Sequence, residues 1–438
     1  MESKNKIPLY LLTMNCNKRA NNNPEMVDKV VGTLPDELVD LYVFGVEEFC
    51  KSIEVFFPAQ SHRRLIEVGN VFMECLRVKY ATNYISLQVI GLAVLGGIGI
   101  IAITPYGLKF SKITQGKVRS GYGYSSLKGA VGLRLRYYGK TTTENESVEL
   151  TFVNAHLPSG EGEYYFSKRN STLIQIIRSL DFGDGYSVIK TGSHCFFMGD
   201  LNYRTLEKQN NSFLDEITDQ ISSNQDDPET LQELVADNDE LLKAKKDGEI
   251  FSGFSEGSIS FFPTYKFHIG KNSYNLKRFP SWCDRILFQS TYKYPQISPL
   301  KRRNDTDITL PVVEKYDSIS DLSFSDHKPV FLRITVPFEP PETMISSNGY
   351  LRILPTVKQS KAFITDDTGF SRLDDEADVS GTTLIYMKAT VVDRIIQLYL
   401  GGLTDILFGW SMWFTTTGKG RVALLIMALL LLFVEYFF

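Results

Sequence analysis

The chain has 438 residues, of which 43% are hydrophobic and 22% are charged, so it can bury a full core and still carry appendages. Its net charge of -4 argues against a general nucleic-acid binder, which would carry a strongly basic surface. The five cysteines are odd in number and lack paired metal-ligand spacing, which indicates free thiols in a reducing compartment. The N-terminal segment has too short an apolar run for a secretory signal, so we expect the folded part to face the cytosol.

Short apolar runs between polar turns predict one large α/β domain over residues 5–337. Most runs are too short for helices, so we expect buried strands at Leu9–Leu12, Leu41–Val46, Val148–Asn154, His194–Met198, Arg285–Phe288 and Val330–Val336. Ile85–Thr104 is uncharged and long enough to span a membrane, but its glycines and the turn at Pro105–Gly107 favour one or two core strands. Helices are predicted at Phe166–Leu180 and Asp227–Lys246, and the second, which is acidic and polar, is expected to lie in solvent.

The composition changes after the predicted domain. Residues 338–394 are predicted to form an acidic flexible linker, because Asp366–Ser380 carries many acids and few large apolar side chains. Residues 395–414 combine tryptophans and leucines with a lone Asp405 and predict an interfacial amphipathic helix; a helix docked on the catalytic domain is the alternative. Residues 422–438 are apolar except for Glu435 and follow two basic residues, which predicts a transmembrane tail anchor inserted from the cytosol. A helix of about 25 Å is short, so the thinner endoplasmic reticulum membrane is the expected location.

Acidic, amide and histidine side chains gather at the ends of the predicted strands. Asp200 and Asn202 follow an apolar strand, and strand alternation places them on the same side at its carboxyl end. Other predicted strand ends carry Asn15, Glu47, Glu48, His156, Asp284, Asp326 and His327. Two of only five histidines therefore lie beside carboxylates, and all these segments together predict a catalytic site.

The donor types at these strand ends predict a magnesium ion. They are hard oxygen ligands, with neither cysteine nor clustered histidine among them, which favours magnesium over zinc. Asn15 and Glu48 are the predicted ligands, with water and substrate filling the remaining positions. A cation there would neutralise the charge of a phosphate and of its leaving oxygen.

Several of these segments together match a known family. Three resemble the signatures of the inositol polyphosphate 5-phosphatases: Gly199–Arg204, Pro280–Leu287 and Ser325–Val330. Further segments are similar and follow in the family's order: Lys128–Val131, Asn154–Leu157 and Phe262–Lys266. The resemblance covers roughly Pro8 to Pro337, and one catalytic domain followed by a hydrophobic tail is similar to the small tail-anchored fungal members that act on phosphatidylinositol 4,5-bisphosphate.

The resemblance implies a DNase I-like α/β fold, a four-layer sandwich of two packed β-sheets with helices outside. It also implies catalytic roles. Asp200 would orient or deprotonate the attacking water, and Asn202 would help to place it. His327, oriented by Asp284, would bind the scissile phosphate, and His156 would make a second phosphate contact. These roles suit the chemistry of each side chain.

The remaining implied roles concern the rim of the site. Asp326 would support the water shell of the metal or the histidine beside it. The family positions that grip the neighbouring ring phosphate match Tyr265, Lys266, Arg278 and Arg285. Lysine point charges and bidentate arginines suit that task.

Three departures from the family pattern stand out. Met14 occupies a position where members usually have tryptophan, which affects the packing beside Asn15. Glu47 replaces a common glutamine, so either Glu47 or Glu48 could bind the metal, and we favour Glu48. Leu276 stands where a basic residue is frequent, and Lys277 would point the other way on an extended segment.

The sequence therefore predicts a magnesium-dependent phosphatase of membrane phosphoinositides, with no nucleic acid and no obligate protein partner. A nuclease and a sphingomyelinase-like phosphodiesterase share the fold, but neither needs the basic segments around Tyr265 and Trp282–Arg285. A non-catalytic phosphoinositide-binding tether would require a broken site, and the predicted catalytic residues are all present. The choice among the bisphosphate, the trisphosphate and soluble inositol phosphates depends on loop shapes that the sequence leaves open.

Overall fold

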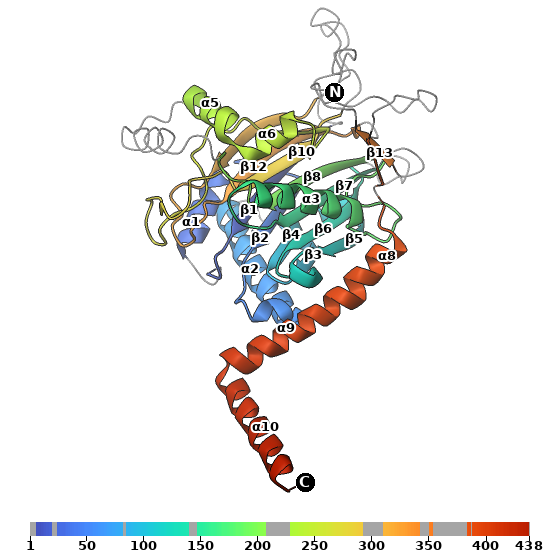
Figure 1. Cartoon of the computed structure of the whole chain (residues 1–438). Helices are drawn as coiled ribbons and strands as arrows, with labels where there is room; N and C mark the ends of the chain where they lie inside the picture. The colour runs from blue at the N-terminus through green and yellow to red at the C-terminus, as the bar shows by residue number, and fades with distance from the viewer. Residues whose placement is uncertain are drawn as a thin grey trace, which may run out of the picture.

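The computed structural model describes residues 6–19, 24–81, 85–139, 147–206, 228–291, 310–341, 350–353, 383–386 and 388–437. Its catalytic part consists of two six-stranded sheets with helices outside, as the resemblance implied (Figure 1). The first sheet has the order β11-β12-β1-β2-β4-β3. The second has the order β5-β6-β7-β8-β10-β9.

The first sheet contains β1 (Lys6–Asn15), β2 (Leu41–Glu47), β3 (Gln88–Leu95), β4 (Ile98–Thr104), β11 (Val312–Ser318) and β12 (Val330–Pro337). The second contains β5 (Phe110–Arg119), β6 (Gly129–Tyr137), β7 (Val148–His156), β8 (Ser193–Asp200), β9 (Phe254–Glu256) and β10 (Asp284–Gln289). All six predicted strand segments lie in these strands. The segment at Ile85–Thr104 forms β3 and β4, as predicted.

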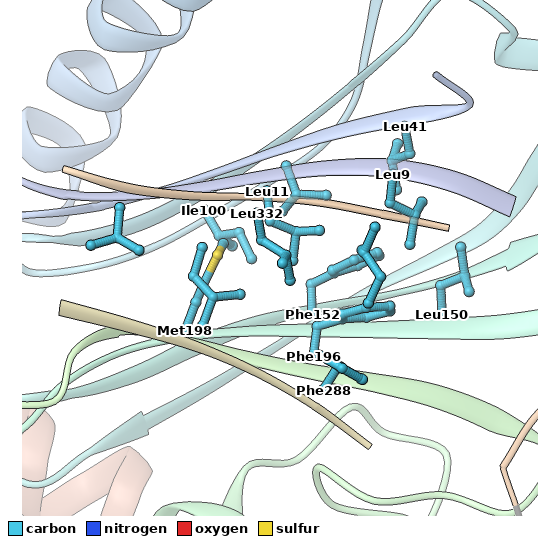
Figure 2. Packing of buried hydrophobic residues seen from close by; sticks show 14 of the residues in the cluster. Leu9, Leu11, Leu41, Ile100, Leu150, Phe152, Phe196, Met198, Phe288 and Leu332 are labelled. Carbon is cyan, nitrogen blue, oxygen red and sulfur yellow. The ribbon is translucent and has the colours of Figure 1, made fainter. Parts of the chain in front are cut away.

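The two sheets pack face to face over one apolar layer (Figure 2). From the first sheet come side chains such as Leu11 and Leu332, and from the second Phe152 and Phe196, whose rings stack with centroids 4.9 Å apart. Every second residue of each strand points into this layer because side chains alternate along a strand. The burial of these side chains fixes the register of both sheets and so the position of every strand end.

Helices cover the outer faces of both sheets. Two pack on the first sheet: α1 (Pro24–Thr33) and α2 (Pro58–Lys79). Two pack on the second sheet: α3 (Glu163–Ser179) and α6 (Glu240–Lys246). The five cysteines are free and buried, in keeping with the prediction of unpaired thiols.

The predicted solvent helix at Asp227–Lys246 needs correction. It is two helices, α5 (Pro228–Asn238) and α6, which meet at Asp239. Asp239 and Glu240 are buried rather than solvated, because each pairs with a buried arginine from elsewhere in the chain. The polar composition of this segment therefore reflects internal ion pairs, which the sequence pattern alone does not reveal.

The predicted linker at 338–394 is partly structured. Tyr350–Ile353 and Thr383–Tyr386 pair as the antiparallel strands β13 and β14, while most of the rest of the predicted linker lies outside the described residues. Then follow α8 (Val391–Ile395), a π-helical segment (Ile396–Leu400), α9 (Gly401–Thr416) and α10 (Gly418–Phe437).

The C-terminal helices bear on the two membrane predictions. The predicted interfacial helix at 395–414 packs against the catalytic domain through the buried Asp405. One face of this helix is therefore docked on the domain, as the alternative prediction had it. In the described part of the chain no single helix is long and apolar enough to cross a bilayer. One pair, Val391–Thr416 with Gly418–Tyr436, qualifies together by length and composition, although it bends by 92° (Figure 1). The tail anchor at 422–438 stays a prediction.

Candidate active site

The predicted site residues meet at one end of the sandwich because of the strand directions. β1 and β2 run parallel and place Asn15 beside Glu47 at their carboxyl ends. β7 and β8 do the same for His156 and Asp200. β10 is antiparallel to β8, so its first residue, Asp284, lies opposite Asp200. Both sheets therefore bring polar groups to the same edge of the apolar layer.

Asp200 is the centre of this cluster and is buried. One of its carboxylate oxygens, Oδ2, accepts a hydrogen bond of 2.9 Å from Asn15 Nδ2. The same oxygen lies 3.2 Å from His156 Nε2 and 3.9 Å from His327 Nε2. Although burial opposes ionisation, the two histidines hold the pKa of Asp200 below its ordinary value, so the group is a carboxylate at neutral pH.

His327 is held by a carboxylate, as predicted. Its Nδ1 lies 2.9 Å from Oδ2 of Asp284, which also accepts a hydrogen bond of 2.7 Å from Thr264. Its ring lies against that of Tyr265, with centroids 4.6 Å apart. Burial alone would lower the pKa of His327, but the carboxylates of Asp284 and Asp200 raise it to about 9. The imidazole therefore carries a proton on both nitrogens at neutral pH.

Asn202 and Arg204 form the turn after β8. Asn202 has a positive φ of 56°, a conformation that is rare outside glycine and is often found at functional sites. Its side chain donates a hydrogen bond to Leu157 O and accepts one of 2.5 Å from Arg204 Nη2. The guanidinium of Arg204 lies 4.4 Å from the ring centroid of Tyr265. Arg204 thus brings a second buried cation to the site, a role that the sequence did not assign.

Lys128 is another member that the sequence analysis did not assign. It immediately precedes β6, and its Nζ contacts His156 Nε2. Burial lowers the pKa of Lys128, whereas the carboxylates of Asp200 and Glu48 counteract that effect. The segment Lys128–Val131 resembles a family segment, but the antiparallel pairing of β6 with β7 is what brings the lysine to His156.

Two glutamates lie at the end of β2. Glu47 is fully buried; its Oε1 accepts a hydrogen bond of 3.1 Å from Thr13, and its Oε2 has no partner among the described residues. Burial and the carboxylates of Asp200 and Asp284 raise the pKa of Glu47. Glu48 is only partly buried and has a positive φ of 47°, so it turns out of the strand. The two residues therefore occupy different depths of the site.

The donor set fits a hard divalent cation. Asp200, Asp284 and His327 bring one possible ligand atom each within 4.8 Å of one another. Because the imidazolium of His327 has no free nitrogen lone pair, the two carboxylates are the donors of this group. Among the described residues, one carboxylate oxygen of Glu47 and one of Asp284 are buried without a hydrogen bond. Buried carboxyl oxygens without a partner are costly, and a bound cation would satisfy them and favour the ionised form that burial disfavours at Glu47. Oxygen donors of this kind suit magnesium or calcium.

The predicted ring-phosphate residues lie at different places. Tyr265 and Lys266 are adjacent to His327, and Lys266 Nζ lies 3.4 Å from a carboxylate oxygen of Asp326. Asp326 therefore faces a lysine and makes no hydrogen bond to the histidine beside it among the described residues. Arg278 is exposed and pairs with Glu161 at 3.2 Å. Lys266 and Arg278 thus remain accessible to a ligand at the rim.

The prediction that Arg285 grips a ring phosphate is wrong. Its side chain is 0% exposed and lies within the protein, because alternation along β10 turns it away from the face that carries Asp284. Its guanidinium makes bonds of 2.7 Å to Asp239 and to both carboxylate oxygens of Glu256. All its strong donors are used inside the fold, so Arg285 is a structural residue.

The family model of endonuclease/exonuclease/phosphatase family 2 matches residues 12–333, which include every strand-end residue described above. The chain belongs to this family. The resemblance to inositol polyphosphate 5-phosphatases is confirmed by its relatives. They include type IV inositol polyphosphate 5-phosphatase 11 of Arabidopsis thaliana, which is 32% identical over 46% of this chain and 51% of that protein. Phosphatidylinositol 4,5-bisphosphate 5-phosphatase A of Rattus norvegicus is 33% identical over 49% of this chain and 20% of that protein.

The chain spans about half or less of the length of these curated relatives. Among solved structures, the inositol polyphosphate 5-phosphatase domain of a synaptojanin, in complex with inositol (1,4)-bisphosphate and calcium, matches with a TM-score of 0.59. It is 23% identical, and the match covers 77% of this chain and 86% of that domain. A Cimex nitrophorin matches with a TM-score of 0.52 at 18% identity, covering 76% of this chain and 99% of that one. These likenesses establish the fold, and the function must be argued from the site.

Proposed function

We propose that this family member is a phosphoinositide 5-phosphatase, a magnesium-dependent phosphomonoesterase that removes the 5-phosphate of phosphatidylinositol 4,5-bisphosphate at a membrane surface. The observation that carries the proposal is the Asp200 carboxylate, buried between two histidines and backed by Asn15. The nearby cations of His327, Lys128 and Arg204 suit an anionic substrate, and the Asp200 carboxylate is a fixed acceptor for water. The names of its relatives support the same chemistry.

The reaction follows from the charges of the side chains. Asp200 accepts a hydrogen bond from the attacking water and orients it; its lowered pKa favours orientation over full removal of a proton. The water oxygen forms a bond to phosphorus and the bond from phosphorus to the ring oxygen breaks, while one proton passes from the water to the ring oxygen. Inorganic phosphate and a ring hydroxyl result. The imidazolium of His327 and the ammonium of Lys128 stabilise the charge on the phosphate oxygens. Asn202 holds the guanidinium of Arg204 in place for the same purpose.

Asn15 and Glu48 are the proposed ligands of magnesium. Asn15 stands beside Asp200, and Glu48 lies near enough to Lys128 to affect its pKa. Glu47 is fully buried, and its Oε2, which has no hydrogen-bond partner in the described part of the chain, would be a further donor. A magnesium ion held there supplies charge neutralisation at the phosphate and at the leaving oxygen.

Metal dependence is the first test. We expect phosphate release from phosphatidylinositol 4,5-bisphosphate in mixed micelles to stop with a chelator and to return with magnesium. Glu48→Gln should weaken magnesium binding by at least about ten-fold, measured by titration calorimetry and by the magnesium dependence of the rate. Glu47→Gln is the paired variant. If only Glu47→Gln raises the required magnesium concentration, Glu47 is the ligand; activity that persists in a chelator would contradict the metal assignment.

The rival activities are separated by product. Magnesium-dependent release of inorganic phosphate indicates a phosphomonoesterase. Cleavage of DNA would indicate a nuclease, and release of phosphocholine from sphingomyelin would indicate a phosphodiesterase. Binding of the lipid without any hydrolysis would leave the tether hypothesis. A panel of the bisphosphate, the trisphosphate and soluble inositol phosphates at fixed magnesium would then rank the substrates.

The pH profile should report His327. Because its pKa is raised to about 9, the imidazolium persists through neutral pH and is lost as the pH rises through that value. We therefore expect kcat to fall above about pH 9. Asp284→Asn removes the nearest raising charge, 2.9 Å from Nδ1, so the falling limb should move about 1 to 3 units lower. If kcat of Asp284→Asn falls at the same pH as kcat of the parent chain, a group other than His327 controls this fall.

The C-terminal helices support a membrane location. From Val392 to Leu407 the face opposite the catalytic domain exposes large apolar side chains at helical spacing: Val392, Ile395, Tyr399, Leu403, Ile406 and Leu407. We propose that this face lies in the lipid interface, that residues 422–438 anchor the chain in the endoplasmic reticulum membrane, and that the catalytic domain faces the cytosol. Fluorescence microscopy of a reporter fused to the tail tests the compartment.

Vesicle flotation tests the apolar face. A chain that ends at Thr417 should still bind vesicles that contain anionic phosphoinositide, but reversibly. Replacing both Leu403 and Leu407 by aspartate should weaken that binding by at least about ten-fold, since each leucine contributes about 1.5 to 3 kcal/mol when buried in lipid. Thr415→Asp, on the same helix but away from the apolar face, is the matched control. Equal binding by both variants would contradict the proposal.

A further inference from the structure

The C-terminal helix docks on the catalytic domain through a row of small and polar residues, beside the aromatic contacts of Phe408 with Phe56 and Tyr122. Gln397, Gly401, Asp405 and Gly409 follow one another at intervals of four and so line one side of the helix. Two of them are glycines at close approaches: a Cβ on Gly401 would lie 2.6 Å from the side chain of Arg119, and one on Gly409 would lie 2.9 Å from Phe56 Cβ. The helix is therefore fitted to this surface of the catalytic domain.

Asp405 makes the strongest contacts on this face and is 8% exposed. Its Oδ2 accepts a hydrogen bond of 2.9 Å from Arg119 Nε, and its Oδ1 accepts two from Ser126, of 2.7 Å from the backbone N–H and 3.0 Å from the hydroxyl. The side-chain amide of Gln397 makes two hydrogen bonds to the backbone of Arg119. Its Oε1 accepts a bond of 2.6 Å from the N–H, and its Nε2 donates a bond of 3.0 Å to the carbonyl oxygen. Bonds to a buried carboxylate are charge-assisted and geometrically specific.

The loop that Asp405 holds leads directly to the active site. It joins β5, which ends at Arg119, to β6, which begins after Lys128. The Ser120 N–H donates a bond of 2.9 Å to Lys128 O and closes the base of the loop. The hydroxyl of Ser126, two residues before Lys128, also lies 3.2 Å from Val55 O, which is an alternative acceptor for its one proton. The ammonium of Lys128 then contacts His156.

We propose that Asp405 is a positioning residue for the phosphatase reaction: through Ser126 it fixes the loop that carries Lys128 to His156. The C-terminal helix is on this view a component of the catalytic unit as well as a membrane contact. A lysine side chain has four rotatable bonds and a strong preference for water, so its burial beside a histidine needs a fixed backbone. The inference rests on the proposed function of the site.

The test uses the full chain and a soluble probe. Inositol 1,4,5-trisphosphate in the absence of vesicles removes any effect of membrane binding. Asp405→Asn keeps the size of the side chain but presents an amide N–H to either Arg119 or Ser126. We expect kcat to fall by between about ten- and a hundred-fold with KM changed less than about two-fold. Thr415→Ala, whose hydroxyl bonds only within the helix, is the matched control and should behave as the parent chain.

A double-mutant cycle separates positioning from general damage. Lys128→Met should be slow, and adding Asp405→Asn to it should change kcat by less than about two-fold. If Asp405→Asn lowers kcat by the same factor in both backgrounds, it acts independently of Lys128 and the proposal is overturned. An unchanged kcat for Asp405→Asn alone overturns it as well.

Hydrogen exchange supplies a readout that does not depend on activity. Peptides that cover Gly121–Lys128 should exchange faster in Asp405→Asn, and peptides from α3 should not. Equal exchange in the parent chain and the variant overturns the proposal. If the parent chain releases no phosphate from any inositol phosphate, the proposed function fails while the exchange experiment still decides whether Asp405 orders the loop.

Discussion

Asp200→Asn is expected to lower kcat for phosphate release by between about 10²- and 10⁴-fold, the range for loss of a positioned acid–base group. The amide keeps the volume of the carboxylate, so the variant should fold. It replaces one acceptor oxygen by an N–H donor in a position that faces Asn15, His156 and His327. The attacking water then loses its charged acceptor. Steady-state kinetics on mixed micelles measures kcat, and circular dichroism shows whether the variant folds.

A surface aspartate provides the control for this experiment. Asp28 lies exposed on α1, and Asp28→Asn makes the same chemical change far from the strand ends. It should leave kcat and KM within about two-fold. An Asp200→Asn variant that keeps most of the activity of the parent chain would remove Asp200 from its proposed role. Hydrolysis of DNA by the parent chain would overturn the assignment of the whole site.

Arg285→Met is expected to lower the free energy of unfolding by about 3 to 5 kcal/mol. The arginine is fully buried, and the substitution would leave the carboxylates of Asp239 and Glu256 in the interior without a counter-charge. Such uncompensated charges cost more than the ion pair itself contributed. Equilibrium unfolding in urea, followed by tryptophan fluorescence, measures the change, because Trp282 is itself buried beside β10.

Arg278→Met is the matched comparison. Arg278 is exposed at the rim, so its loss should change stability by no more than about 0.5 kcal/mol. It should instead raise KM for phosphorylated substrates if the arginine binds a ring phosphate. We thus expect Arg285→Met to lower stability and Arg278→Met to weaken substrate binding. Equal stability of the Arg285→Met variant and the parent chain would contradict the structural role given to Arg285.

The strand ends could be predicted from the sequence because two simple regularities govern them. Short apolar runs with β-branched residues marked the strands, and the polar residue that ended each run was a candidate for function. The structure brings Asn15, His156, Asp200, Asp284 and His327 together at one edge, as that reasoning requires.

The errors and omissions share a physical cause. Asp239 lies 46 residues from Arg285, and Ser126 lies 279 residues from Asp405. A periodic pattern shows which face of an element is polar, but it does not show which distant group will cover that face. The sequence pattern therefore predicts a solvent helix at Asp227–Lys246 and leaves the docked face of the C-terminal helix as an alternative, and the family resemblance alone assigns Arg285 to the substrate. The role of Lys128 does not follow from the sequence, because its position depends on a loop closed from elsewhere in the chain.

The order of strands in the first sheet has a consequence for synthesis on the ribosome. β1 lies between β2 and β12, yet β12 follows it by more than 300 residues in the chain. At a synthesis rate of about 5 to 20 residues per second, one edge of β1 stays unpaired for at least about fifteen seconds. Asn15 and His327 can meet only after that interval. The nascent chain therefore emerges without a complete active site, and its exposed strand edge is where we expect chaperones to bind.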